Sequence, residues 1–366
     1  MYTPTDYKLM LQAIEMAKSG MFTTAPNPNV GCVIAHDETV VGAGCHMRAG
    51  EPHAEVHALQ QAGVRAQGAT AYVTLEPCAH YGRTPPCSEA LIRAGVSKVI
   101  CAMEDPNPKV AGRGVKMLRD AGIDVQVGLM QQEAESLNRG FIKLMRTGLP
   151  FVQLKMAASL DGQTALSNGQ SQWITSKESR RDVQAYRSKA CAILSTSQTV
   201  LDDDASLAVR WDELPEHIQD KYPQSKLRQP LRLILDRQQR LRPELKLFKT
   251  GGDVLVVDQQ ADGLQVPYNS AGLLDLQATF EQVSKSHHIN HIWVEGGATL
   301  ARSLIQEGLI DEVILYLAPK IMGSDGRGLF GALGLEDMQD VLELDILDVR
   351  RIGPDLRVTA TFRRQS

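Results

Sequence analysis

Several features are scarce in this 366-residue sequence, and each scarcity excludes a class of function. Aromatic residues make up 5% of the chain, and the formal net charge is −4 with a pI near 6.2. Neither value fits the basic, aromatic-rich surface that binds nucleic acid. No apolar run approaches the length of a membrane span, and residues 1–6 lack the basic and apolar regions of a signal peptide. We therefore expect a cytoplasmic, soluble protein with no nucleic-acid partner and no membrane partner.

Cysteine is also sparse, and no internal repeat or low-complexity tract stands out. The six cysteines are too scattered for a disulfide framework and indicate reduced thiols in a cytosolic protein. Cys32, Cys45, Cys101 and Cys191 are expected to be buried packing residues. The remaining two, Cys78 and Cys87, belong to a motif that suggests a metal.

The motif combines His53-Ala54-Glu55 with Pro77-Cys78 and Cys87. A catalytic zinc site needs three protein ligands and one open position, and His53, Cys78 and Cys87 would supply the three. Zinc lowers the pKa of its bound water toward neutrality. Glu55 matches the glutamate, not itself a ligand, that moves protons in zinc-dependent base deaminases. The motif predicts hydrolytic deamination.

Other interpretations of these residues stay open at this point. The histidine and cysteines could be core residues or a closed structural zinc site, for which His80 is near enough in sequence to be a fourth ligand. The spacing is also unusual, because eight residues separate Cys78 from Cys87 where the common deaminase signature has two. That insertion is long enough to reach a substrate.

Hydrophobic periodicity and chain length predict two α/β domains, with the break near residues 147–150. Pro52 is expected in the first turn of a helix through Leu59, and a further helix is expected over residues 87–94. The first domain, residues 1–146, should hold strands at 30–35, 40–45, 71–75, 99–103 and 123–127, and helices at 6–19, 114–121 and 131–146. The second, residues 150–366, should hold strands at 151–156, 192–195, 231–235, 254–257, 292–294, 313–317, 342–350 and 356–362, with irregular segments at 203–228 and 236–252.

The second domain offers one candidate phosphate site, a strand that runs into Gly296-Gly297 and then a helix. Glycines allow close approach of an anion to exposed backbone amides. An ordinary turn between strand and helix explains the glycine pair as well, and the Rossmann spacing is absent. Lys155, Ser159 and Asp161 could add polar groups at a strand end, or could be surface charges.

Together the motifs resemble the bifunctional riboflavin-biosynthesis deaminase/reductase family. The resemblance rests on residues 26–31, 74–87 and 105–108 in the first half, and on residues 155–162, 171–175, 200–204 and 293–300 in the second. It implies a cytidine-deaminase-like zinc domain followed by a dihydrofolate-reductase-like α/β reductase domain. The implied reactions are removal of the 2-amino group of 2,5-diamino-6-(ribosylamino)pyrimidin-4-one 5′-phosphate, then reduction of its ribosyl chain to ribityl with NADPH.

The resemblance also assigns residues, position by position. Zinc would be bound by His53, Cys78 and Cys87, with Glu55 as the proton shuttle. The positions that match substrate contacts are Asn27, His46, His80, Arg83, Asp105, Asn107, Ser171, Arg187, Leu207, Arg210 and Glu295. The positions that match NADPH contacts are Ala157, Trp173, Thr199, Asp203 and the loop of Gly297, Ala298, Thr299, Leu300, Ala301, Arg302 and Ser303.

Two other classes of function compete with this interpretation. A tRNA or nucleoside deaminase would share the zinc core but should have a basic or aromatic binding face. A zinc scaffold with a metabolite-sensing domain would not need Glu55. The family also implies a homo-oligomer, and it leaves the proton source for reduction open, with Lys155 and Asp161 as candidates.

Overall fold

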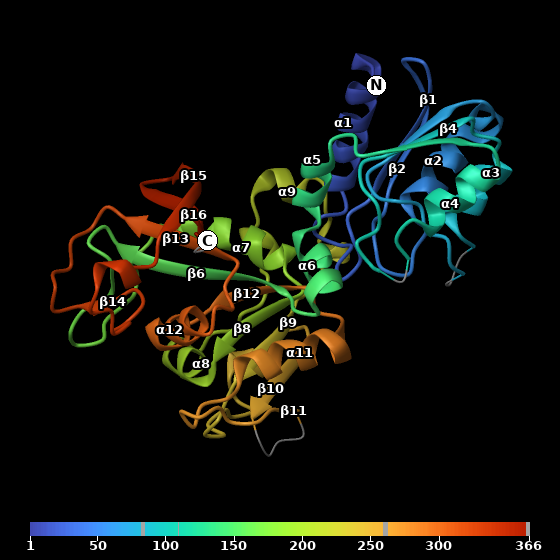
Figure 1. Cartoon of the computed structure of the whole chain (residues 1–366). Helices are drawn as coiled ribbons and strands as arrows, with labels where there is room; N and C mark the ends of the chain where they lie inside the picture. Colours follow the sequence, from blue (N-terminus) through green and yellow to red (C-terminus); the bar gives the residue numbers. More distant parts are fainter. Residues whose placement is uncertain (82–84, 109, 259–262, 364–366) are drawn as a thin grey trace. The chain divides into compact units, whose positions relative to one another are not determined.

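The computed structural model describes residues 1–81, 85–108, 110–258 and 263–363. It divides into two compact units, Met1–Gly148 and Leu149–Ser366 (Figure 1). Each unit has its own main sheet, and we describe the two separately.

The first unit is a mixed sheet of order β2-β1-β3-β4-β5 in the described chain. β1 pairs antiparallel with β2 and β3, while β3, β4 and β5 run parallel. The strands are β1 (Gly31–His36), β2 (Thr39–Cys45), β3 (Thr70–Val73), β4 (Lys98–Cys101) and β5 (Asp124–Val127). The helices are α1 (Pro4–Lys18), α2 (Ala54–Ala62), η1 (Gly63–Ala66), α3 (Cys87–Arg93), α4 (Arg113–Asp120), α5 (Gln131–Leu137) and α6 (Arg139–Thr147).

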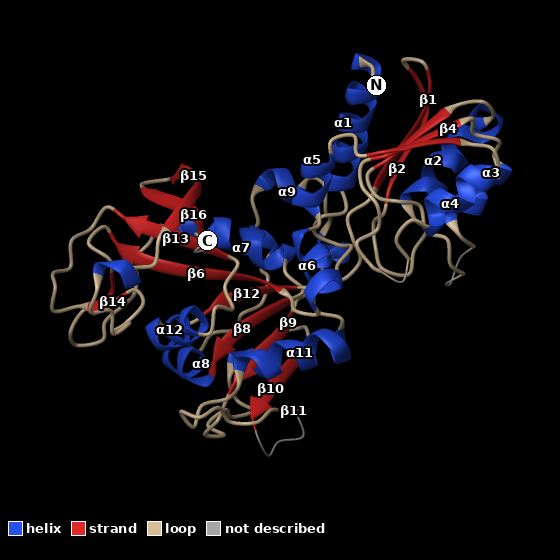
Figure 2. Cartoon of the chain, in the orientation of Figure 1, coloured by secondary structure: helices blue, strands red, loops and turns tan. Residues whose placement is uncertain are grey.

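Alternation along the strands divides the core of this unit into two layers. Cys32 and Ile34 of β1 pack with residues of α2, α3 and α4, whereas Val33 and Ala35 pack with α1, α5 and α6. Successive strand residues point to opposite faces, so the sheet is covered by helices on both sides (Figure 2).

Two glycines of β2 let α2 lie very close to the sheet. A Cβ on Gly42 would lie 2.1 Å from the carbonyl oxygen of Ala58, and one on Gly44 would lie 2.6 Å from that of Ala54. Neither glycine has a positive φ, so both are required by proximity rather than by backbone conformation. They set how closely α2, the helix that begins beside His53, approaches the sheet.

The second unit contains a larger sheet, with the order β11-β10-β9-β8-β12-β6-β13-β16-β15 in the part described. Strands from β11 to β13 in this order are parallel, and β16 and β15 complete it antiparallel. β7 and β14 form a separate antiparallel pair. The strands are β6 (Phe151–Ser159), β7 (Gln163–Ala165), β8 (Ala192–Thr196), β9 (Leu231–Leu235), β10 (Val254–Asp258), β11 (Leu264–Gln265), β12 (His291–Glu295), β13 (Glu312–Ala318), β14 (Arg327–Gly328), β15 (Leu344–Ile352) and β16 (Asp355–Phe362).

Helices of the second unit follow its strands and pack on its sheet (Figure 2). One core cluster joins Val183 of α7 and Val200 of α8 to Ile193, Trp293 and Ile314 of the sheet. The helices are α7 (Lys177–Lys189), α8 (Ser197–Asp203), η2 (Trp211–Glu213), α9 (Glu216–Gln219), η3 (Gln224–Lys226), α10 (Lys246–Lys249), α11 (Leu276–His287), α12 (Ala298–Gln306) and η4 (Met338–Asp340).

The structure corrects some of the predicted elements. The helix expected over residues 131–146 is two helices, because Asn138 leaves helical geometry and binds the backbone of Asn29 through both ends of its amide, at 2.7 and 3.0 Å. The helix expected to begin at Pro52 begins at Ala54, with His53 as its extended N-cap. The break at Asn138 comes from a tertiary contact that periodicity does not report.

Two further features of the structure concern membrane-spanning helices and disulfides. In the described residues, no helix combines the length and apolar character needed to span a bilayer. All six cysteines are free, and Cys32, Cys45, Cys101 and Cys191 are buried, as predicted.

Candidate active sites

His53, Cys78 and Cys87 come together in the first unit. Their ligand atoms all lie within 4.8 Å of one another. The Nδ1 atom of His53 is 3.3 Å from Sγ of Cys87 and 3.6 Å from Sγ of Cys78. One imidazole and two thiols are the donors that zinc prefers, and three ligands leave a fourth position for water or substrate. The residues therefore fit a catalytic zinc ion.

Local structure places each of these side chains. His53 is the N-cap of α2, Cys78 follows β3, and Cys87 is the first residue of α3. The backbone N–H of Cys87 donates to Sγ of Cys78 at 3.3 Å. Ser88 donates both its backbone N–H and its hydroxyl to the carbonyl of Cys78, so the two cysteine segments are joined.

The surroundings favour a thiolate at Cys78 and leave Glu55 divided between its protonated and ionised forms near neutral pH. The Cys87 thiol, the His53 ring and the Cys87 N–H lower the pKa of Cys78 well below its ordinary value, against the effect of burial. Glu55 is 3% exposed. Burial raises its pKa to about 7, although hydrogen bonds from its own N–H and from Cys87 oppose the rise. A group with such a pKa can both accept and release a proton.

A closed four-ligand site does not form among the described residues. The metal-binding group found there contains three residues, and His80, the rival fourth ligand, is exposed and not part of it. The open coordination position is what separates a catalytic zinc site from a structural one.

Several of the predicted substrate contacts surround this group. His46 packs edge-on against His53 at 5.3 Å between ring centroids, and its Nε2 lies 3.0 Å from the amide of Asn27. Asp105 accepts the N–H of Asn107 at 2.8 Å and interacts electrostatically with His80. Arg83 lies outside the described residues.

Glu76 is a feature that the sequence did not single out. Its buried carboxylate accepts four backbone N–H groups, from Asp105, Gly112, Gly114 and Val115, at 2.8 to 3.1 Å. It thereby joins the segment that ends in Cys78 to the loop that contains Asp105 and Asn107. The one feature of the sequence that could have drawn attention to Glu76 is its position directly before Pro77-Cys78.

The second unit contains a cavity of about 1160 Å³ at the carboxyl ends of β6, β8, β9 and β12. This edge of a parallel sheet is where α/β proteins bind ligands. Its volume can hold a dinucleotide together with a sugar phosphate. The predicted contact residues that line it are Ala157, Ser171, Thr199, Asp203, Glu295, Gly297, Ala298, Thr299, Leu300 and Ser303.

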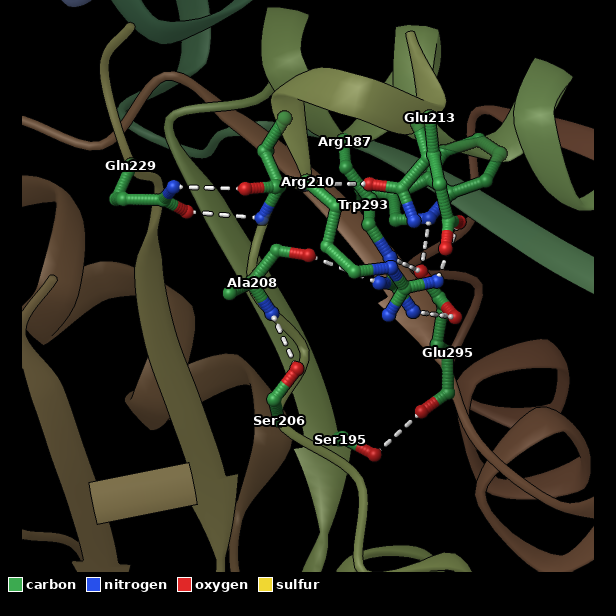
Figure 3. Close-up of polar contacts among 11 residues, drawn as sticks. Arg187, Ser195, Ser206, Ala208, Arg210, Glu213, Gln229, Trp293 and Glu295 are labelled. Atoms are coloured by element: carbon green, nitrogen blue, oxygen red, sulfur yellow. Dashed lines mark hydrogen bonds and ion pairs between the residues drawn. The ribbon is translucent and has the colours of Figure 1, made fainter. Parts of the chain in front are cut away.

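Glu295 forms the most highly connected polar group at this cavity (Figure 3). The guanidinium of Arg187 donates to it twice, from Nε at 2.5 Å and from Nη2 at 2.8 Å. Burial would raise the pKa of Glu295, but the charge and hydrogen bonds of Arg187, with help from Lys155 and Trp293, lower it to about 2. Glu295 is therefore ionised at neutral pH.

Arg187 also connects the remaining substrate positions. Its Nη1 donates to the carbonyl of Ala208, next to Leu207, at 3.1 Å. Arg210 bonds Glu213 at 2.7 Å through its guanidinium (Figure 3). Leu207 is buried and has a φ of 51°, so the segment before Arg210 is sharply bent.

Other predicted residues lie apart from the cavity lining. Trp173 is exposed beneath the guanidinium of Arg180, and Ala301 is buried in α12, while Arg302 is also outside the lining. The segment from Ala298 to Gln306 is a helix, as expected after the glycine pair, although the resemblance treats residues 297–303 as a loop. Asp161 accepts the N–H groups of Met322 and Gly323 and does not line the cavity, whereas Lys155 does.

Three arginines that line the cavity, Arg237, Arg240 and Arg327, were not predicted from the sequence. Arg237 and Arg240 follow β9, and both line the cavity. Arg240 donates to Gln198 at 2.8 Å and to Ser197 at 3.3 Å. Arg237 and Arg240 both lie within residues 236–252, for which the sequence predicts an irregular segment without a binding motif.

Comparison with known proteins agrees with these two sites. Residues 3–103 match the cytidine and deoxycytidylate deaminase zinc-binding region, and residues 150–358 match the RibD C-terminal domain. The riboflavin biosynthesis protein RibD of Escherichia coli is 53% identical over 359 residues, which cover 96% of this chain and 98% of that protein. The chain belongs to the RibD family. It is a bifunctional enzyme of riboflavin biosynthesis, with a zinc deaminase and an NADPH-using reductase in one chain.

Solved structures of the RibD family have the same fold. RibD of Acinetobacter baumannii, form 1, has a TM-score of 0.91 at 44% identity, covering 98% of this chain and 99% of that one. A diaminohydroxyphosphoribosylaminopyrimidine deaminase/5-amino-6-(5-phosphoribosylamino)uracil reductase from Thermotoga maritima has a TM-score of 0.84 at 31% identity, covering 98% and 99%. The predicted fold class, family and pair of activities are confirmed.

Proposed function

We propose that residues 1–146 deaminate 2,5-diamino-6-(ribosylamino)pyrimidin-4-one 5′-phosphate, and that residues 150–366 reduce the ribosyl chain of the product to ribityl. The observation that carries the proposal is the cluster of His53, Cys78 and Cys87 around an open position beside buried Glu55. The Thermotoga maritima relative is named for the same two activities, which supports the proposal.

In the deaminase, His53, Cys78 and Cys87 hold the zinc ion. Zinc supplies a water of lowered pKa. Glu55 accepts a proton and delivers it to the departing amine, a task suited to its pKa of about 7. Asn27, His46, His80, Arg83, Asp105 and Asn107 bind and orient the pyrimidine phosphate.

In the reductase, the cavity would hold NADPH, which would supply the hydride for reduction of the ribosyl chain at C1′. The cofactor contacts proposed are Ala157, Trp173, Thr199, Asp203 and residues 297–303. Those that line the cavity are Ala157, Thr199, Asp203, Gly297, Ala298, Thr299, Leu300 and Ser303. Arg240 and Arg237 are well placed for the 2′-phosphate, which calls for basic donors. Ser171, Arg187, Leu207, Arg210 and Glu295 orient the ribotide. Lys155, rather than Asp161, holds the proton that this reduction needs.

We further propose that the enzyme is a cytoplasmic homo-oligomer. Six free thiols suit a reducing compartment. The edge strand β15 exposes Ile346, Leu347 and Val349, an apolar surface typical of a subunit interface.

A two-stage assay tests the proposal. Ammonia release from the diaminopyrimidine ribotide is measured without NADPH, and NADPH oxidation is then measured with pre-deaminated ribotide, each with and without a zinc chelator. Chelation should stop ammonia release and leave reduction intact. Absence of both steps with these substrates would overturn the proposed substrate, and deamination of cytidine or of adenosine-containing RNA would favour a different one.

A further inference from the structure

Trp293 is a buried residue of β12 that contacts Glu295 directly. Its indole Nε1 donates a hydrogen bond to Oε1 of Glu295 at 2.8 Å (Figure 3). Residues two apart on a strand share a face, so both side chains project toward α7. The indole is 0% exposed. Trp293 therefore packs in the core and also hydrogen-bonds a carboxylate that lines the cavity.

The indole is held in place from the side of α7. Tyr186 stacks on Trp293 with 4.8 Å between ring centroids and 17° between planes. Arg357 lies over the ring of Tyr186 at 5.5 Å and forms an ion pair with Asp182 at 2.9 Å. Tyr186 and Arg187 are consecutive in α7, and they contact Trp293 and Glu295 respectively. This close packing fixes the orientation of the indole ring.

We infer that Trp293 is a positioning residue for the reductase, whose indole N–H fixes the carboxylate of Glu295 so that Oε2 faces the ribotide. The inference rests on the proposed function, in which Glu295 contacts that substrate. Trp293 is not among the proposed contacts of NADPH or ribotide, and it acts on the substrate through Glu295.

The two carboxylate oxygens of Glu295 accept different numbers of hydrogen bonds, and this difference supports the assignment. Oε1 accepts Nε of Arg187 at 2.5 Å and the indole N–H at 2.8 Å. Among the described residues, Oε2 accepts one hydrogen bond, from Nη2 of Arg187 at 2.8 Å. A carboxylate oxygen can accept two hydrogen bonds. Oε1 is therefore fully occupied, and Oε2 can accept another from a ribosyl hydroxyl.

The substitution Trp293→Phe tests the inference, because it keeps an aromatic ring on Tyr186 and removes the N–H. We expect kcat/KM for the pre-deaminated ribotide to fall about tenfold, in line with loss of a hydrogen bond to a charged group. The KM for NADPH and the rate of ammonia release should stay within about twofold of the wild-type values. The matched control is Ser195→Ala, which removes the 2.5 Å hydrogen bond to the backbone carbonyl of Glu295 and leaves the carboxylate untouched. It should keep reductase kcat/KM within about twofold.

A double-mutant cycle separates positioning from packing. In a Glu295→Ala background, Trp293→Phe should have almost no further effect on reductase kcat/KM, because its target is gone. A full tenfold loss in that background would overturn the inference, as would equal losses from Trp293→Phe and Ser195→Ala.

A second variant covers the case in which Trp293→Phe does not fold. Tyr186→Leu keeps the indole N–H and removes the stacking that holds it, and it should lower kcat/KM for the ribotide with the KM for NADPH unchanged. Wild-type reductase kinetics with this variant would overturn the inference. If the wild-type chain itself does not reduce the ribotide, the proposed function fails, which is a separate result.

Discussion

The carboxylate of Glu76 accepts the backbone N–H of Asp105 at 3.0 Å, and so connects the segment before Cys78, a proposed zinc ligand, to a loop proposed to bind substrate. Three further N–H groups, from Gly112, Gly114 and Val115, share the same carboxylate. One side chain thus sets the position of the loop relative to the metal ligands.

Glu76→Gln should therefore impair substrate binding more than zinc binding. The glutamine amide nitrogen would face two N–H donors and could accept neither, which leaves buried donors unsatisfied at about 1–3 kcal/mol each. We expect the KM for the diaminopyrimidine ribotide to rise about tenfold while zinc content stays at the wild-type level. Steady-state ammonia release and metal analysis measure the two quantities. Loss of zinc with an unchanged KM would contradict this role.

Glu55→Gln should abolish ammonia release and retain zinc. The amide matches the carboxylate in shape but cannot accept and release the proton, so the rate should fall by at least about a hundredfold. Zinc content measured by mass spectrometry shows that the metal site survives. Turnover at the wild-type rate would exclude Glu55 as the proton shuttle.

Cys87→Ser should remove zinc and deamination without affecting reduction, because the two sites belong to different units of the chain. The three tryptophans, Trp173, Trp211 and Trp293, all lie in the second unit, so tryptophan fluorescence reports on its folding alone. We expect an unchanged fluorescence unfolding curve and an unchanged rate of NADPH oxidation. A loss of reductase activity in step with zinc would show that the sites depend on one another.

The ion pair of Glu295 with Arg187 should make the second unit less stable at low pH. The pKa of Glu295 is lowered to about 2 in the folded protein from the model-peptide value of 4.5. Because the pKa is lower in the folded state, the ionised carboxylate adds to the free energy of unfolding above pH 4.5, and this contribution is lost as the pH falls toward 2. At neutral pH the contribution is about 3 kcal/mol. Urea unfolding followed by tryptophan fluorescence should show a gap between wild type and Glu295→Gln that closes over this range. A gap that is independent of pH would contradict the linkage.

Arg240→Ala should weaken selection of NADPH over NADH. If the arginine binds the 2′-phosphate, its loss should raise the KM for NADPH about tenfold and leave the KM for NADH unchanged. Ammonia release by the same preparation is the control. Equal increases in both KM values would place Arg240 elsewhere on the cofactor.

The zinc site could be predicted from the sequence because its chemistry needs particular residue types in a short span. The motif spans 35 residues, from His53 to Cys87, and includes Glu55 and Cys78. A proline directly precedes each of the two cysteines and marks a turn. The family resemblance also singled out Glu295 and Arg187, which are 108 residues apart and meet as an ion pair; their proposed contact with substrate stays a prediction.

The residues that escaped prediction owe their roles to tertiary contacts. Glu76 acts through backbone N–H groups up to 39 positions away, which carry no signature in the sequence. Asn138 interrupts a helical pattern because its amide finds Asn29, 109 positions earlier. Trp293 has the periodicity of an ordinary core residue, and only its geometry reveals the bond to Glu295.

The closeness of α2 to β2 has a consequence for any redesign of the deaminase. Gly42 and Gly44 belong to neither the metal-binding group nor the proposed substrate contacts, yet any side chain at either position would push α2 outward by its backbone at Ala58 or Ala54. His53 and Glu55, at the start of that helix, would move with it. In a library randomised along β2 and selected for ammonia release, both positions should return glycine, and the alignment of survivors would record a helix-to-sheet distance rather than a binding preference.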